Sequence, residues 1–121
     1  MAKILIIEDE VETAKLLVSG LSRHGFETVV ANDAYQGTEF AHKEKPDLII
    51  LDLMLPAGGG IFVLRNLRLS LTIAHIPIIV VTGNQDAQYK QKVLDEGVEA
   101  YLGKPFVLEE LIDAIQNILK E

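Results

Sequence analysis

The feature that most constrains this chain is the alternation of five short apolar runs with segments of helical periodicity. The runs are Lys3–Ile7, Glu27–Ala31, Asp47–Leu51, Pro77–Val81 and Val98–Leu102. Runs one, three and four are nearly continuous Ile, Leu and Val, which is typical of strands buried on both faces of a parallel sheet. Between the runs, apolar residues recur at helical spacing. The pattern therefore predicts five strand–helix units and an α/β fold.

Local signals agree with this order. Gly25 and Gly97 lie where helix C-terminal caps are expected. Right-handed crossovers with helices on both faces predict a doubly wound, flavodoxin-like (βα)5 fold, with a five-stranded parallel sheet in the strand order 2-1-3-4-5. In such sheets the functional site lies beyond the carboxyl ends of the strands, where the strand order reverses. We therefore expect the site between the first and third strands.

Composition limits the class of protein. The 121 residues fit one domain, spanning 1–121, and the absence of Cys excludes disulfides, thiolate metal sites and cysteine nucleophiles. The formal net charge of −7 disfavours direct binding to nucleic acid, because phosphate backbones repel an acidic surface. No apolar run approaches the roughly 18 residues of a membrane helix, and the start does not resemble a signal peptide. We expect no membrane partner and a cytoplasmic location.

Polar side chains follow four of the five runs. Glu8-Asp9-Glu10 follows the first run, Asp52 the third, Thr82 the fourth and Lys104-Pro105 the fifth. At a separation of about 5 Å, the carboxylates of Asp9 and Asp52 repel by roughly 3 kcal/mol at an effective dielectric constant near 20. Protonation, Lys104 or a cation must relieve this repulsion. Carboxylate oxygens favour Mg²⁺, with Mn²⁺ as the alternative, and none of the three His lies at these strand ends.

The same residue types fit a phosphoryl group. Lys104 would neutralise one phosphoryl oxygen, Thr82 would donate a hydrogen bond to another, and Asp52 would act as an in-line nucleophile that forms an acyl phosphate. Each residue alone has a plainer interpretation. Asp9 with Glu12 fits a capping box, Asp52 a turn, Thr82 a strand filler and Lys104 a solvated lysine. Their joint occurrence in strand order favours the site.

These ordered motifs resemble the receiver domains of two-component response regulators over essentially the whole chain. The matching segments are Lys3–Glu10, Pro46–Pro56, Ile76–Thr82 and Gly97–Phe106. The resemblance implies that Asp52 is the phosphorylated aspartate. It also implies a set of Mg²⁺ ligands, namely Asp9, Asp52, the backbone carbonyl of Met54 and, through water, Glu8.

The resemblance further implies a switch. Thr82 and Lys104 would bind the phosphoryl group, Thr82 would move toward it, and Tyr101 would turn inward. The surface formed by the last two helices and the strand between them would then change and alter partner binding. The Lys104–Pro105 bond would be cis. The plainer interpretation of Tyr101 is a half-buried strand aromatic with its hydroxyl in water.

The partners follow from the same resemblance. The phosphoryl donor would be a sensor histidine kinase, a histidine phosphotransfer protein or a small phosphodonor. The chain would be a switch with weak autophosphorylation and autodephosphorylation rather than a metabolic enzyme. Its output would be a downstream protein target or its own effector domain, and phosphorylation-dependent pairing of two copies is a further expectation.

Two alternative protein classes with a different chemistry fit the sequence less well. A phosphatase of the dehalogenase type needs a second Asp two residues after the nucleophile, but Val11 stands two residues after Asp9. A flavin binder needs a first loop that cradles phosphate, which Glu8-Asp9-Glu10 would repel. A receiver excised from a larger transcription regulator or hybrid kinase remains open. A degenerate, docking-only receiver is disfavoured by the complete site.

The chain departs from the usual family pattern near the site. Gly83 stands where Ala is common, which should widen access to the phosphoryl group. Met54 and Asn84 occupy positions that tune phosphoryl lifetime in the family, and neither is an acid or a base, so we expect no side-chain-assisted hydrolysis from them. The run Gly58-Gly59-Gly60 predicts a mobile loop beside the phosphorylation site.

A second departure concerns the predicted third helix, Ile61–Leu71. Phe62 and Leu69, seven residues apart, share a face that is usually polar in the family. Scattered surface hydrophobicity explains them most simply. An additional docking or self-association surface is the alternative.

Overall fold

The sheet at the centre of the fold has five parallel strands in the order β2-β1-β3-β4-β5. The computed structural model describes residues 1–55, 59–84 and 86–120. The strands are β1 (Lys3–Ile7), β2 (Glu27–Ala31), β3 (Leu48–Asp52), β4 (Ile78–Thr82) and β5 (Ala100–Gly103). The predicted fold class and strand order are therefore confirmed.

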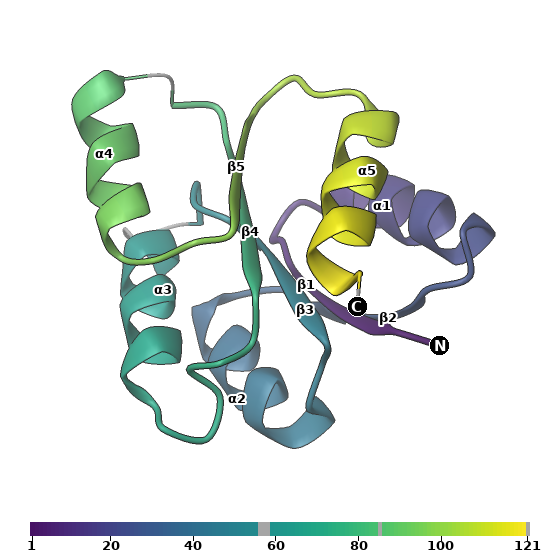
Figure 1. Cartoon of the computed structure of the whole chain (residues 1–121), viewed down its shortest axis with the longest axis horizontal. Coiled ribbons are helices and arrows are strands. Elements are labelled where there is room, and N and C mark those ends of the chain that lie inside the picture. Colours follow the sequence, from purple (N-terminus) through teal and green to yellow (C-terminus); the bar gives the residue numbers. More distant parts are fainter. Residues whose placement is uncertain (56–58, 85, 121) are drawn as a thin grey trace.

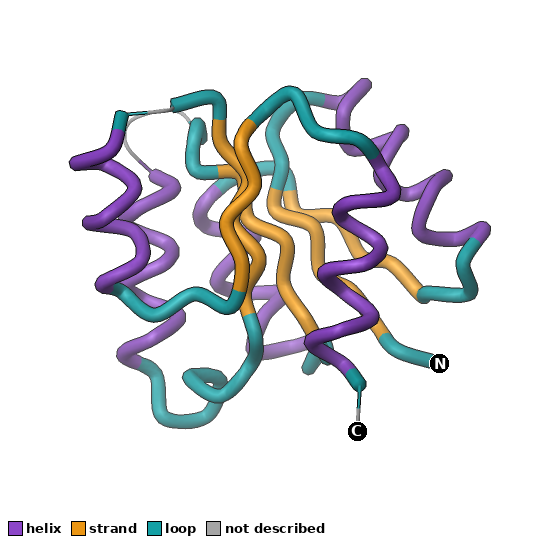
Figure 2. Tube along the Cα trace, turned by 45° about the horizontal axis from the view of Figure 1, so that its top comes forward, coloured by secondary structure: helices purple, strands orange, loops and turns teal. Residues whose placement is uncertain are grey.

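Within the described residues, five helices cover both faces of this sheet. Helices α1 (Val11–Arg23) and α5 (Leu108–Leu119) lie on one face. Helices α2 (Ala34–Glu44), α3 (Gly59–Leu69) and α4 (Ala87–Asp95) lie on the other. Figures 1 and 2 show the resulting three layers, with the strands between the two sets of helices. The described residues contain no helix that is long and apolar enough to cross a membrane.

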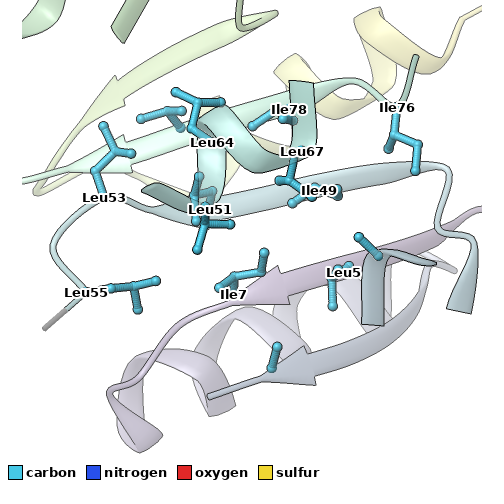
Figure 3. Close-up of a cluster of buried hydrophobic side chains, with 14 of the residues drawn as sticks. Leu5, Ile7, Ile49, Leu51, Leu53, Leu55, Leu64, Leu67, Ile76 and Ile78 are labelled. Carbon is cyan, nitrogen blue, oxygen red and sulfur yellow. The ribbon is translucent and has the colours of Figure 1, made fainter. Parts of the chain in front are cut away.

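The core consists of two apolar clusters, one on each face of the sheet. Alternate residues of a strand point to opposite faces, so Leu5 and Ile7 of β1 enter one cluster while Ile4 and Ile6 enter the other. Strand β3 divides in the same way. Figure 3 shows the first cluster, in which Leu64 and Leu67 of α3 lie beside Ile49 and Leu51 of β3 and Ile78 of β4. Burial on both faces explains why these runs are almost continuously apolar.

Three strands differ from their predicted bounds by one or two residues, and the differences concern the site. β3 ends at Asp52, which pairs with Val81, and β4 ends at Thr82, which pairs with Gly103. β5 begins at Ala100, two residues later than predicted. Asp52 and Thr82 thus belong to the last rungs of the sheet rather than to loops, so the sheet fixes their backbone.

The predicted helix C-terminal glycines are confirmed, but the alternative N-terminal capping box is not. Gly25 and Gly97 adopt positive φ angles of 86° and 87° after α1 and α4, as expected of helix C-terminal residues. The N-cap of α1 is Glu10 and has no side-chain cap, so the alternative capping box of Asp9 with Glu12 is wrong.

The expectation of a mobile glycine loop also needs correction. Gly59 and Gly60 are the first two residues of α3, and both are buried. The prediction of a mobile loop is therefore wrong for these two residues, because the glycines let α3 begin in close contact with its surroundings. Gly58 lies outside the described residues.

Candidate functional site

Three carboxylates converge at the carboxyl ends of β1 and β3. Glu8 and Asp9 follow β1, Asp52 ends β3, and one carboxylate oxygen of each lies within 4.8 Å of the others. The two strands are neighbours on either side of the point where the strand order reverses. The sequence prediction that these acids meet at this edge is confirmed.

The Asp52 carboxylate is held at both oxygens. Asp52 is buried, with only 3% of the residue exposed. Oδ1 accepts a hydrogen bond of 2.9 Å from the Met54 backbone N–H, and Oδ2 accepts one of 2.9 Å from Lys104 Nζ. These two donors fix the direction in which the carboxylate faces the surrounding pocket.

Glu8 is the most deeply buried acid of the cluster, with 2% of the residue exposed. Oε2 accepts a hydrogen bond of 3.1 Å from the Glu10 backbone N–H. Oε1 has no hydrogen-bond partner within the described residues, and Lys104 Nζ lies 3.6 Å from it. Burial raises the pKa of Glu8 to about 7, and repulsion by Asp52 adds to this, although the Glu10 N–H and Lys104 oppose it.

Lys104 follows β5, and its side chain carries a positive charge into the site. Burial acts to lower the pKa of the Lys104 ammonium, but its hydrogen bond to Asp52 and the charges of Asp52 and Glu8 outweigh burial, so the pKa is raised. The Lys104 N–H donates to the Thr82 carbonyl at 2.8 Å, and the Lys104–Pro105 bond is cis, as the resemblance implied. One ammonium thus contacts two of the three clustered carboxylates, those of Glu8 and Asp52.

The donor set fits a hard divalent cation. An open cavity of about 320 Å³ is lined by Glu8, Asp9, Glu10, Asp52, Met54 and Lys104. The clustered side-chain ligands are all carboxylates, and the buried Oε1 of Glu8 has unused acceptor capacity. Mg²⁺ prefers oxygen ligands from a few carboxylates together with water. The residues present therefore fit a magnesium ion.

A second group of residues extends from the site toward α4. Thr82 is fully buried, and its Oγ1 accepts a hydrogen bond of 3.1 Å from the Asn84 N–H. Tyr101 is half-buried, as the plainer interpretation expected, and its hydroxyl donates to the Asn84 carbonyl at 3.0 Å. Lys90 Nζ of α4 is 5.3 Å from the centre of the Tyr101 ring. Asn84 thus connects the two predicted switch residues.

The comparisons with known proteins agree with this geometry. The family model for the response regulator receiver domain matches residues 4–116. This chain belongs to that family. Among its relatives, response regulator ArlR of Staphylococcus saprophyticus is 38% identical over 99% of this chain and 53% of its own length. Response regulator MprA of Mycobacterium leprae is 35% identical over 98% of this chain and 51% of its own length. The receiver domain thus spans about half the length of the curated relatives it matches.

Solved structures resemble this receiver domain along nearly its whole length. A putative response regulator from Chloroflexus aurantiacus is 28% identical, with a TM-score of 0.91 and coverage of 99% of this chain and 98% of that one. Chemotaxis protein CheY4 of Vibrio cholerae is 28% identical, with a TM-score of 0.90 and coverage of 98% and 99%.

Two features of this receiver domain had no clear signal in the sequence. The connection through Asn84 depends on its backbone N–H and carbonyl, which every residue type except proline carries. The burial of Glu8 depends on the packing of β1 between its neighbours. By contrast, the predicted apolar face of α3 is exposed, since Phe62 and Leu69 are 63% and 79% accessible. A docking role for this face stays the alternative to scattered surface hydrophobicity.

Proposed function

We propose that this receiver domain is a phosphorylation-controlled switch that accepts a phosphoryl group on Asp52. The donor is the phosphohistidine of a sensor histidine kinase or histidine phosphotransfer protein, or a small phosphodonor. The observation that carries the proposal is the Asp52 carboxylate itself, held between the Met54 N–H and the Lys104 ammonium beside two further acids.

The transfer balances with the residues at hand. An oxygen of Asp52 forms a P–O bond while the P–N bond of the phosphohistidine breaks, and the imidazole leaves with the electron pair and takes a proton from solvent. Lys104 pairs with a phosphoryl oxygen. Thr82 donates a hydrogen bond to another. In such transfers the protein acts mainly by positioning groups and neutralising charge.

The residues around Asp52 would also hold a divalent ion, which would supply further positive charge during the transfer. Asp9, Asp52, the Met54 backbone carbonyl and, through water, Glu8 would hold Mg²⁺ or Mn²⁺. A bound ion would supply positive charge to a cluster of three carboxylates, of which only Glu8 and Asp52 contact the Lys104 ammonium among the described residues. The protein's own part is to keep these oxygens at one edge of the sheet, with Glu8 ionised.

The switch would use the hydrogen bonds around Asn84. A phosphoryl group adds about −1.5 to −2 charges and three strong acceptors. When the Thr82 hydroxyl turns toward this group, Oγ1 gives up its bond with the Asn84 N–H, and the Asn84 carbonyl holds Tyr101. The change therefore spreads to β5 and α4, and the surface of α4, β5 and α5 would alter its binding of partners.

The output is proposed at two levels. If the receiver stands alone, its switched surface would bind a separate protein target. If the receiver is part of a longer regulator, the switched surface would act on an effector domain of the same protein. The length of the relatives favours the second, as one of them, from Synechocystis, is named a DNA-binding dual master transcriptional regulator. We propose a single receiver domain over 1–121 that makes no direct nucleic-acid contact, because it is acidic.

Three further properties belong to the same proposal. Two phosphorylated copies would pair through the switched surface. The location would be cytoplasmic, where ATP supplies histidine kinases. The domain would catalyse only weak phosphorylation and dephosphorylation of itself, since Met54 and Asn84 offer no acid or base for hydrolysis.

The test uses the protein with Mg²⁺ and a small acyl phosphate, and counts added phosphoryl groups by mass spectrometry. We expect one phosphoryl group on the wild type and none on Asp52→Asn or in the presence of a chelator. Asp47→Asn is a matched control, because Asp47 lies just before β3 at the opposite edge of the sheet. Labelling that survives Asp52→Asn or the chelator would refute the proposal.

A further inference from the structure

Gly60 packs against backbone rather than against side chains. A Cβ at this position would lie 2.3 Å from the Leu53 carbonyl oxygen, 2.5 Å from its Cα and 2.6 Å from its carbonyl carbon. A side-chain rotation cannot relieve contacts with backbone atoms. Helix α3 can therefore approach the end of β3 this closely only with glycine at position 60.

Backbone freedom does not account for this glycine. Gly60 is the second residue of α3 and lies within the helix. Among the described residues, the glycines with positive φ are Gly25 and Gly97, where a left-handed conformation favours glycine. The requirement at position 60 is thus for space.

The peptide that Gly60 contacts is the one that orients Asp52. The Leu53 carbonyl and the Met54 N–H belong to the same planar peptide group, which moves as a unit. The Met54 N–H donates to Asp52 Oδ1 at 2.9 Å. The preceding peptide is anchored to β4, because the Leu53 N–H donates to the Val81 carbonyl at 3.1 Å. The orienting peptide therefore lies between a fixed strand and α3.

We infer that Gly60 is a positioning residue for the phosphoacceptor. Its bare α-carbon sets the place of the Leu53–Met54 peptide, and that peptide sets the direction of the Asp52 carboxylate. The consequence for phosphorylation rests on the proposed function of Asp52. The consequence for the geometry of the Leu53–Met54 peptide does not depend on that function.

The chain offers two matched controls for Gly60→Ala. Gly59→Ala changes the neighbouring residue in the same turn of α3, where a Cβ would lie 3.3 Å from Ala34 Cβ and 3.5 Å from Leu55 Cβ. Gly20→Ala also creates a contact well under 3.0 Å, at 2.5 Å, but with the flexible end of the Leu108 side chain between α1 and α5. These controls separate helix propensity and general crowding from displacement of the peptide.

Two measurements are made well below the unfolding temperature of each variant. The first is the Met54 amide resonance in ¹H–¹⁵N spectra, without phosphodonor. The second is the rate of phosphorylation by a small acyl phosphate with Mg²⁺. For Gly60→Ala we expect a folded protein, a shifted Met54 amide and a rate lower by roughly 10- to 100-fold, because small misplacements of reacting groups are costly. Both controls should keep the wild-type amide position, and their rates should stay within about twofold of the wild-type rate since the peptide stays in place.

The results that would overturn the positioning role of Gly60 differ from those that would overturn the proposed function. An unchanged amide or an unchanged rate in Gly60→Ala overturns the inference, and so does an equal loss of rate in either control. An unfolded Gly60→Ala protein also overturns it, because the inference requires that one displaced peptide relieve the contact. A wild type that is not phosphorylated rejects the proposed function, while the Met54 amide still tests the positioning.

Discussion

Replacing Glu8 by glutamine should stabilise the protein when no divalent ion is bound. The Glu8 carboxylate is buried, its Oε1 has no hydrogen-bond partner within the described residues, and its pKa is raised from 4.5 to about 7. An ionised Glu8 therefore opposes folding in the absence of a cation. Glutamine keeps the shape of the side chain and removes the charge.

The sign and size follow from this pKa. Between pH 4.5 and pH 7 the folded protein holds a proton on Glu8 that the unfolded chain has released, so the free energy of unfolding falls as the pH rises through this window. The shift corresponds to roughly 3 kcal/mol at about 1.4 kcal/mol per unit. Above pH 7 the loss is complete, and Glu8→Gln should recover most of it.

Urea unfolding followed by circular dichroism, in a chelator, measures the effect. At pH 8 we expect the Glu8→Gln midpoint to exceed that of the wild type by roughly 1–3 M, and the difference to shrink toward pH 5. Glu12→Gln is the control, because Glu12 is an exposed carboxylate in the first turn of α1. Equal pH slopes for the wild type and Glu8→Gln would refute the reasoning.

Three further predictions concern the metal, the switch and the frame of the fold. Mg²⁺ affinity, measured by calorimetry, should fall as the pH drops below 7, by at most about tenfold per pH unit, because protonation removes the charge that Glu8 offers through water; a pH-independent affinity contradicts this. Thr82→Ala should still be phosphorylated, but the Tyr101 ring resonances should no longer respond; an intact response contradicts the proposed coupling. Arg68→Met should lower the free energy of unfolding by about 3 kcal/mol, since the guanidinium donates to three backbone carbonyls and a carboxylate. Arg65→Met, which removes an exposed ion pair, should cost less than about 1 kcal/mol, and equal losses would contradict the assigned role of Arg68.

The sequence predicted the sheet well, because its strands are buried on both faces. The bounds of β1 and β2 are as predicted. The apolar runs stop one residue short of the ends of β3 and β4, since Asp52 and Thr82 are polar, although both residues were expected at the strand ends. Their inclusion is set by pairing with Val81 and Gly103 on the neighbouring strands. Hydrophobic patterning therefore locates such strands but not their last, functional rung.

The sequence predicted that the polar side chains of the site would lie together, but it did not predict their burial or their pKa values. Residue types and strand order placed Asp9, Asp52 and Lys104 at one edge of the sheet. The burial of Glu8 and its raised pKa depend on tertiary packing, which no local pattern reports. The glycine run was misread for a similar reason. A glycine that provides flexibility and one that permits a close contact, as Gly60 does, look the same in a sequence.

The central claim is that the Asp52 carboxylate accepts the phosphoryl group. Borohydride reduces an acyl phosphate of aspartate to homoserine, so peptide mass spectrometry of the treated and then reduced protein reports the modified position directly. We predict homoserine at position 52 after incubation with Mg²⁺ and phosphodonor, and unmodified aspartate there when a chelator is present. Homoserine at another aspartate, or at position 52 regardless of the chelator, would contradict the account.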